Sequence, residues 1–212
     1  MAEAAIAKPG LGAVDPAPDH VDFAGLLGRD AWRRLPAAVR ARFTARAEVT
    51  TYEGEMLVEA STPGFLFAQA CRLIGRPLAP WRGEAVPVSV TVWTDPRGAL
   101  VWDRLYRFER RRPTLVSSRK VADHRGLVEI VRCGLGMALD LTVEDGALHF
   151  RSRRYFLQLG GLRAPIPTVL TPGRAHVVHR DEGGGRFRFT LAFDHPWFGR
   201  TLFQDGSFAD PA

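Results

Sequence analysis

Residues 99–108 read Ala99-Leu-Val-Trp-Asp-Arg-Leu-Tyr-Arg-Phe108 and form the clearest alternating segment of the chain. Side chains alternate between the two faces of a β-strand, so every second residue of this segment shares a face. One face carries Leu100, Trp102, Arg104, Tyr106 and Phe108. If this aromatic row faces the interior, Arg104 needs a carboxylate or a ligand; if it faces water, the aromatic rings need a cover. Because a neighbouring segment offers a carboxylate, Glu129, we expect the row to face inward.

Further alternating segments surround this strand, separated by turn sequences such as Glu144-Asp-Gly146. We count about eight or nine antiparallel strands, at residues 47–61, 86–93, 99–108, 114–122, 127–133, 137–143, 147–159, 174–180 and 187–193. The predicted fold is therefore mainly β (α+β). It is an antiparallel β-barrel or a strongly curved sheet of about 8–9 strands, with short N-terminal helices packed at one end.

The remaining segments predict helices and loops. Residues 22–46 predict two short helices, the second opened by Pro36, and residues 63–74 predict another, capped by Thr62. Residues 195–208 carry loop punctuation and no long amphipathic helix. This ending favours a closed or nearly closed barrel over a helix-grip fold, which a long C-terminal helix normally closes.

The length of 212 residues suits one domain. Residues 1–20 are rich in Ala, Pro and Gly without a periodic apolar face, and they predict a disordered leader. Residues 21–208 then form a single β-rich domain, and residues 209–212 form a tail.

The basic charge of the chain is notable, at +6 net, and could indicate nucleic acid or an anionic membrane as a partner. However, only Lys8 and Lys120 among the 29 basic residues are lysines, and the chain has no Asn, a skew that resembles the codon bias of a GC-rich bacterial genome. The basic and aromatic set comprises Arg107, Arg110, Arg111, Arg112, Arg151, Arg153, Arg154 and Tyr155. We interpret it as a solvated rim and do not expect nucleic acid as a partner.

The cysteines and the N-terminus bear on location. Cys71 and Cys133 lie far apart in apolar stretches, and we interpret both as small buried hydrophobes in a reducing compartment. The N-terminus lacks the cationic start and apolar run of a signal peptide, and no window has the ~18 continuous apolar residues of a membrane span. The expected location is the cytoplasm.

Glu129 is a second charge in an apolar row, because it shares a strand face with Leu127, Val131 and Cys133. An unpaired buried carboxylate is strongly destabilising, so we expect Arg104 and Glu129 to satisfy each other. The pair could be structural, fixing strand register, or it could line a cavity and hold the polar end of an otherwise apolar ligand. The predicted ligand-binding residues are Trp102, Arg104, Tyr106, Phe108 and Glu129.

A C-terminal cluster contains the residue types of nucleophilic catalysis. Its members are His195, Gln204, Asp205 and Ser207. No GxSxG nucleophile elbow accompanies them, so we do not predict catalysis there. We expect instead a rigid clasp whose aromatic residues cover one barrel end. These are Trp197, Phe198, Phe203 and Phe208.

Metal and dinucleotide sites are not predicted. His176 and His179 are three residues apart, which in a strand sends them to opposite faces, and no HExxH or Cys/His ladder is present. Gly134-Leu-Gly-Met-Ala-Leu139 departs from the dinucleotide fingerprint, because Leu139 stands where Gly or Ala is needed and no helix pattern follows. We therefore expect no cofactor.

Several short motifs along the chain resemble an uncharacterised bacterial domain family. They are Phe23-Ala-Gly-Leu-Leu-Gly28 with Leu35-Pro36, Val101-Trp-Asp-Arg104, Glu129 with Gly134-Leu-Gly-Met137, Gly173, His195-Pro-Trp-Phe-Gly199 and Phe203-Gln-Asp-Gly206. Members of that family occur alone or at the C-terminus of proteins whose front half resembles saccharopine dehydrogenase. The resemblance spans residues 22–208 and implies a stand-alone domain that could have a dehydrogenase-like protein as a partner; it implies no activity.

Three functions remain open. The leading one is a binding domain for an apolar or amphipathic, lipid-like small molecule in a barrel cavity. The second is an accessory or interaction domain with a packed interior, working beside a dehydrogenase-like partner. The third, with least weight, is an enzyme on a small hydrophobic substrate that uses Glu129, its pKa raised by apolar surroundings, as acid or base. A cavity bordered by Trp102 and Arg104 would favour the first, and a solid interior the second.

Overall fold

The structure is a computed structural model that describes residues 21–44, 49–74, 77–160 and 162–211. The predicted leader, residues 1–20, lies outside the described residues. The described chain begins with Val21, whose side chain is buried.

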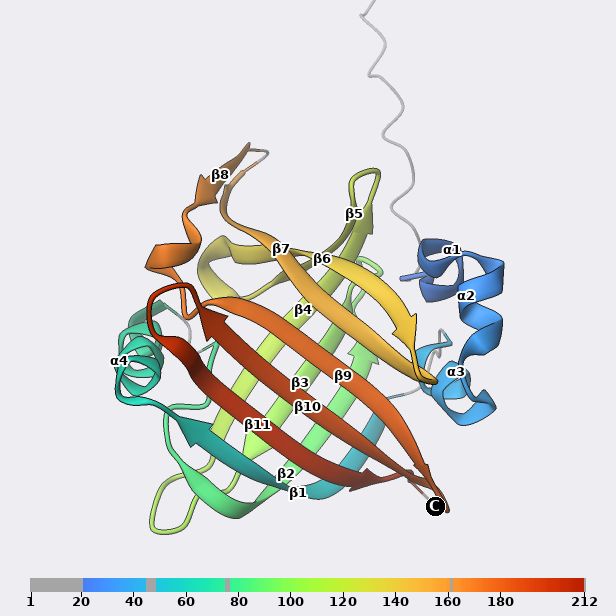
Figure 1. Ribbon diagram of the computed structural model, residues 1–212, viewed down its shortest axis with the longest axis horizontal. Coiled ribbons are helices and arrows are strands. Elements are labelled where there is room, and N and C mark those ends of the chain that lie inside the picture. The colour runs from blue at the N-terminus through green and yellow to red at the C-terminus, as the bar shows by residue number, and fades with distance from the viewer. Residues whose placement is uncertain (1–20, 45–48, 75–76, 161, 212) are drawn as a thin grey trace, which may run out of the picture.

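The fold is a closed antiparallel β-barrel, as predicted (Figure 1). The strands are β1 (Thr50–Ala60), β2 (Gly83–Thr94), β3 (Leu100–Tyr106), β4 (Thr114–Asp123), β5 (Gly126–Ile130), β6 (Leu135–Glu144), β7 (Ala147–Leu159), β8 (Leu162–Ile166), β9 (Arg174–Gly183), β10 (Arg186–His195) and β11 (Gly199–Ala209). Consecutive strands pair from β1 to β7, β7 pairs with β9, and β11 returns to pair with β1. The barrel thus has ten strands, with β8 paired only to β7 outside it, rather than the predicted eight or nine.

The strand that closes the barrel, β11, was predicted to be a loop. Its side chains alternate as in the other strands, with Leu202, Gln204 and Phe208 buried. Gly206, which suggests a turn in the sequence, lies within the strand at a close approach to β1. A Cβ added to Gly206 would lie 2.7 Å from the backbone oxygen of Glu55. The glycine is therefore required by packing between neighbouring strands rather than by a turn.

Short helices occupy both ends of the barrel (Figure 1). At one end lie α1 (Phe23–Leu27), α2 (Arg29–Arg34) and α3 (Ala37–Phe43), which are three helices where two were predicted. Gly28, with a φ of 78°, separates α1 from α2, because its left-handed conformation interrupts the helix. At the other end α4 (Thr62–Cys71) packs against β11 and β1 and continues into the 3₁₀ turn η1 (Arg72–Ile74). Its cap is Ser61, not Thr62, because the Ser61 hydroxyl accepts from Gly64 N at 3.3 Å.

The α3 end of the barrel is filled by side chains from α3. The ring of Phe43 lies 4.9 Å from His179 and 6.1 Å from Trp102, centroid to centroid. Beside it, Arg42 forms ion pairs with Asp181 at 2.9 Å and Asp210 at 2.6 Å. These contacts fix α3 to β9 and to the segment after β11, and they close this end of the interior.

Candidate functional site

The aromatic row of β3 faces the barrel interior. Trp102, Arg104 and Tyr106 are all buried, and Phe108, just beyond the strand, is buried as well. The rings of Tyr106 and Phe108 stack with centroids 5.7 Å apart. The row therefore adopts the predicted inward orientation, and its arginine needs a partner inside the protein.

The partner of Glu129 is Lys120, not Arg104 as the sequence suggested. The hairpin between β4 and β5 places Lys120 directly opposite Glu129, and Lys120 Nζ lies 3.4 Å from Glu129 Oε2. The same ammonium lies 3.9 Å from the ring centroid of Trp102, in cation–π geometry. The alternation of β4 contains the signal for this pairing, since Lys120 shares its inward face with Val116 and Ser118.

Arg104 is connected to the pair through a hydroxyl. Its Nη2 donates to Ser118 Oγ at 3.1 Å, and Ser118 also forms a hydrogen bond with the carboxylate of Glu129. No carboxylate forms an ion pair with Arg104 anywhere in the described parts of the chain. This group of side chains therefore contains a neutral Lys120–Glu129 pair and one further cation, Arg104.

Burial and mutual charge shift the pKa values of this pair. Burial alone would raise the pKa of Glu129, but Lys120, Arg104 and the Ser118 hydrogen bond outweigh it, and the net direction is downward. The expectation of a raised pKa was therefore wrong, and Glu129 is held as a carboxylate. Burial lowers the pKa of Lys120, an effect that Glu129 opposes and Arg104 reinforces.

Two interior cavities adjoin this group of charges. The larger, about 90 Å³, extends toward α4 and is lined by Trp102, Arg104, Lys120 and Glu129 together with apolar residues. These apolar residues include Cys71, Leu78, Met137, Phe150, Leu191 and Phe193. The smaller, about 40 Å³, lies at the α3 end and shares Trp102, Arg104 and Phe189 with the first. These three side chains therefore stand between the two cavities.

The five predicted ligand-binding residues separate into two groups. Trp102, Arg104 and Glu129 line the larger cavity, whereas Tyr106 and Phe108 do not. The Tyr106 hydroxyl donates to Gln204 Oε1 at 2.9 Å, which links β3 to β11 across the interior. Lys120 and Ser118, which the sequence analysis did not select, belong to the polar part of the site.

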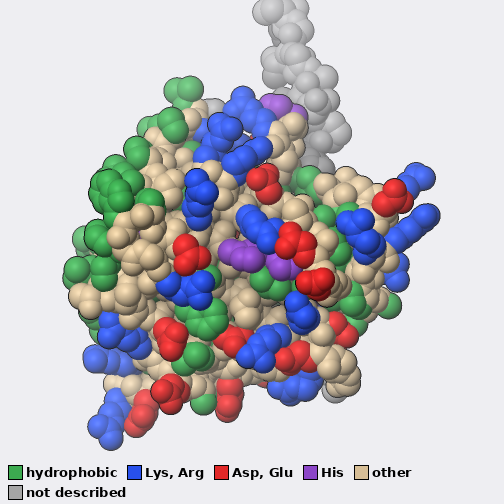
Figure 2. Space-filling view, viewed as in Figure 1, with side chains coloured by type: hydrophobic (Ala, Val, Ile, Leu, Met, Phe, Trp, Pro, Cys, Tyr) green, Lys and Arg blue, Asp and Glu red, His purple; other side chains and the backbone are tan. Residues whose placement is uncertain are grey.

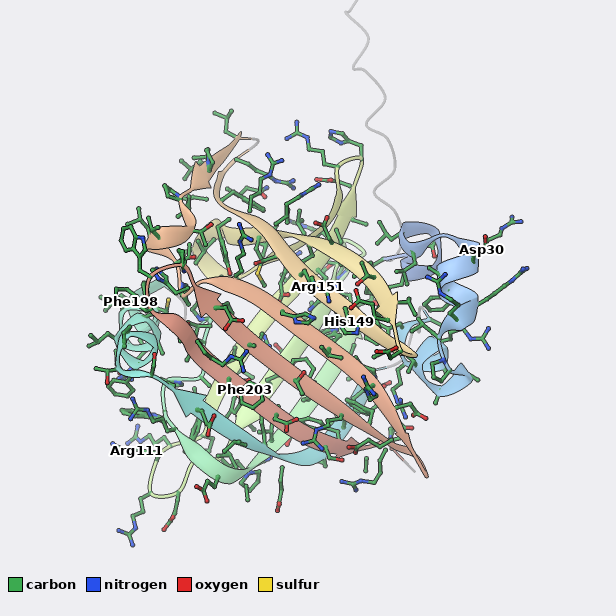
Figure 3. The ribbon with its side chains drawn as sticks, viewed as in Figure 1. Asp30, Arg111, His149, Arg151, Phe198 and Phe203 are labelled. Carbon is green, nitrogen blue, oxygen red and sulfur yellow. The ribbon has the colours of Figure 1, made fainter. Side chains whose placement is uncertain are left out.

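The C-terminal cluster does not assemble into a catalytic triad. The His195 ring accepts from Trp197 N at 3.1 Å and lies 3.2 Å from the carbonyl oxygen of Val169, while Asp205 forms an ion pair with Arg188. Nor do its aromatic residues form the predicted clasp. Trp197 and Phe198 are exposed, Phe203 lies on the outer side of β11, and Phe208 belongs to the core (Figure 3).

The basic and aromatic set is divided between the interior and the outer face. Tyr155 is buried, and its hydroxyl donates to the carbonyl of Gly173 at 2.6 Å. On the outer face of β7, Arg151 pairs with Glu144 at 2.7 Å (Figure 3). Figure 2 shows acidic and basic side chains interspersed over this face of the barrel. The visible face therefore carries no continuous basic surface.

The two histidines of β9 lie on the faces predicted for them, whereas one of the two cysteines does not. His176 and His179 face opposite sides, as predicted: His176 Nε2 lies 2.9 Å from His149 Nδ1 outside, and His179 lines the smaller cavity. The described residues include no group of three or more His, Cys, Asp or Glu side chains that could hold a metal. Cys71 is buried, but Cys133, predicted to be buried, is exposed in the 3₁₀ turn η2 (Arg132–Gly134).

Fold and site together define an antiparallel β-barrel protein with a charged interior cavity. The chain belongs to the family described as domain of unknown function (DUF4166), whose model matches residues 35–208. Comparison with curated proteins and with solved structures gave no match in either case. Among the helices of the described residues, none is long and apolar enough to cross a membrane.

Proposed function

We propose that this domain binds a small amphipathic molecule inside the barrel. The observation that carries the proposal is the cavity beside Trp102, which combines mostly apolar walls with one charged group of side chains. Binding pockets for small molecules have this composition, with few polar groups that fix orientation. Trp102 supplies apolar wall, and Arg104 with the Lys120–Glu129 pair supplies the polar anchor.

The volume of the cavity limits the size of the ligand. An engineered cavity of ~150 Å³ holds benzene, whereas pockets for drug-sized ligands have ~300–1,000 Å³. A cavity of about 90 Å³ therefore suits a molecule with a short apolar part. A longer, lipid-like chain would require the side chains at the α4 end to move.

Native mass spectrometry of the protein purified from its own host tests this proposal. We expect a co-purified small molecule that is released on denaturation. Leu191→Phe, which adds volume at the cavity wall, should abolish its retention, while Thr190→Phe on the outer side of β10 should not. Absence of any bound molecule, together with no binding of short amphipathic probes, would overturn the proposal.

A second candidate is an accessory domain that works beside a dehydrogenase-like protein. Exposed apolar side chains near α4 favour it, since such residues often mark protein interfaces (Figure 2). They are Leu66, Leu73, Leu170, Trp197 and Phe198. If this surface binds a protein, Trp197→Ser with Phe198→Ser should remove a dehydrogenase-like protein from affinity preparations of the domain. Retention of that protein by the double variant would contradict this second candidate.

A further inference from the structure

Among the described residues, the buried side chains of Arg42 and Arg104 differ in their partners. The side chain of Arg42 is only 5% exposed, and two carboxylates, from Asp181 and Asp210, neutralise it. Arg104 is buried as well, yet no carboxylate of the described residues forms an ion pair with it, and Glu129 pairs with Lys120. Because an arginine stays protonated in proteins, the interior at Arg104 holds one cation more than it holds anions.

The buried polar atoms of the cavity that lack a hydrogen-bond partner in the described parts of the chain also favour an anionic ligand. Two buried side-chain atoms of the cavity lining, Trp102 Nε1 and Arg104 Nε, have no hydrogen-bond partner among the described residues. Both are donors only, and neither can accept a hydrogen bond. A buried donor without an acceptor is costly, and more so when it is charged. The cavity is therefore complementary to a group that accepts hydrogen bonds and carries negative charge.

We propose that the ligand of this cavity is a short-chain carboxylic acid, bound as its carboxylate against Arg104 and Trp102. The inference rests on the proposed function and assigns the charge of the ligand. A carboxylate matches the planar guanidinium and brings one negative charge, which balances the single excess cation. A phosphate dianion would exceed that charge.

The position of Arg104 also orients the ligand. Arg104 lies between the two cavities, whereas Cys71 of α4 and Leu78 line the larger cavity at its other side. The carboxylate therefore lies deep in the barrel, and the alkyl part points toward α4. Leu191, Phe193 and Met137 surround this alkyl part.

Paired probes test the charge of the ligand separately from binding itself. Butyrate and hexanoate are titrated against 1-butanol and 1-hexanol by NMR and calorimetry at pH 7. We expect each acid to bind at least about tenfold more tightly than its alcohol, because the carboxylate gains charge-assisted hydrogen bonds. Equal binding of acid and alcohol would overturn the carboxylate inference and leave the proposed function intact. Binding of neither would count against the proposed function itself.

Variants then assign the preference to the named side chains. Arg104→Gln should remove the tenfold preference for the acids, because a carboxylate loses more affinity than a hydroxyl when the guanidinium is replaced by a neutral amide. Arg119→Gln, on the outer face of β4, is the matched control and should keep the preference. Trp102→Phe, which keeps an aromatic ring without the donor, should weaken acid binding more than alcohol binding, and it serves as the test if Arg104→Gln does not fold. An acid preference that persists in the folded Arg104 or Trp102 variant overturns the assignment.

Discussion

Replacing Lys120 by Met should destabilise the barrel far more than replacing Arg104 by Met. The change Lys120→Met removes the ammonium 3.4 Å from Glu129 and leaves a carboxylate that is only 8% exposed without its ion-pair partner. Breaking one side of a buried ion pair costs ~3–5 kcal/mol. Since the Ser118 hydroxyl and Arg104 still interact with the carboxylate, we expect the lower figure, about 3 kcal/mol of unfolding free energy at pH 7.

Arg104→Met has two opposing effects. It loses one hydrogen bond to Ser118, a contribution of ~1 kcal/mol, and it relieves the burial of a cation without an ion-pair partner. The unfolding free energy should therefore stay within about 1 kcal/mol of the wild type. Lys120→Met combined with Glu129→Met removes both members of the ion pair and should recover most of the loss, because apolar replacement of a whole buried pair is often neutral or stabilising.

Urea unfolding followed by circular dichroism and tryptophan fluorescence measures these differences. The pKa of Glu129 is lowered in the folded wild type, so its contribution to stability is present above the unfolded pKa of ~4.3 and is lost as the pH falls through the folded pKa. The gap between wild type and Lys120→Met should therefore narrow in acid. Equal destabilisation by Arg104→Met and Lys120→Met would refute this reasoning, since it would make Arg104 an equal partner of Glu129.

Three further predictions concern other parts of the barrel. Burial, assisted by Arg42, lowers the pKa of His179 to about 3. Between ~pH 6.5 and 3 the unfolded chain binds a proton at His179 and the folded chain does not, so the free energy of unfolding falls with decreasing pH by up to ~1.4 kcal/mol per pH unit. His179→Leu should flatten this slope in urea titrations. An unchanged slope would contradict the lowered pKa of His179. Cys133 should react rapidly with a disulfide reagent, whereas Cys71, its pKa raised to about 11 by burial, should react only after unfolding; two fast thiols would contradict this assignment. Gly64→Ala should cost about 2 kcal/mol or more, because its Cβ would collide with a β11 carbonyl. Ala70→Ser, on the exposed side of α4, should change stability by less than ~0.5 kcal/mol, and equal effects at the two sites would contradict the packing of α4.

Strand alternation made much of the barrel predictable. The inward row of β3 follows from alternation alone, and the turns between β2 and β7 lie close to where Gly, Asp and Pro place them. Alternation is a local property and does not depend on which strands become neighbours. The mainly β fold and the inward position of Trp102, Arg104 and Tyr106 therefore needed no tertiary information.

Predicting which charged side chains pair requires the strand register, which alternation does not supply. Arg104 and Glu129 looked complementary because both are charges in apolar rows, but charge complementarity does not specify adjacency. The hairpin pairs Asp123 with Gly126, and that register brings Lys120 opposite Glu129. The register of the β4–β5 hairpin follows from its turn, so the sequence around the turn already indicates that Lys120 lies opposite Glu129. The contact between Arg104 and Ser118 depends in addition on the register between β3 and β4.

Closure of the barrel and assembly of the site both depend on β11, which the sequence predicted to be a loop. Gly199 and the sequence Asp205-Gly-Ser207 suggest turns, yet these residues belong to a strand whose glycine is required by the approach of β1. Once β11 pairs with β1 and β10, Gln204 reaches Tyr106 across the interior at 2.9 Å. This hydrogen bond engages the Tyr106 hydroxyl at the end of the β3 row that lies away from the ion pair. Tyr106 does not line the cavity. Local sequence signals therefore identify which side chains enter the interior, while the closing strand determines which of them remain available to a ligand.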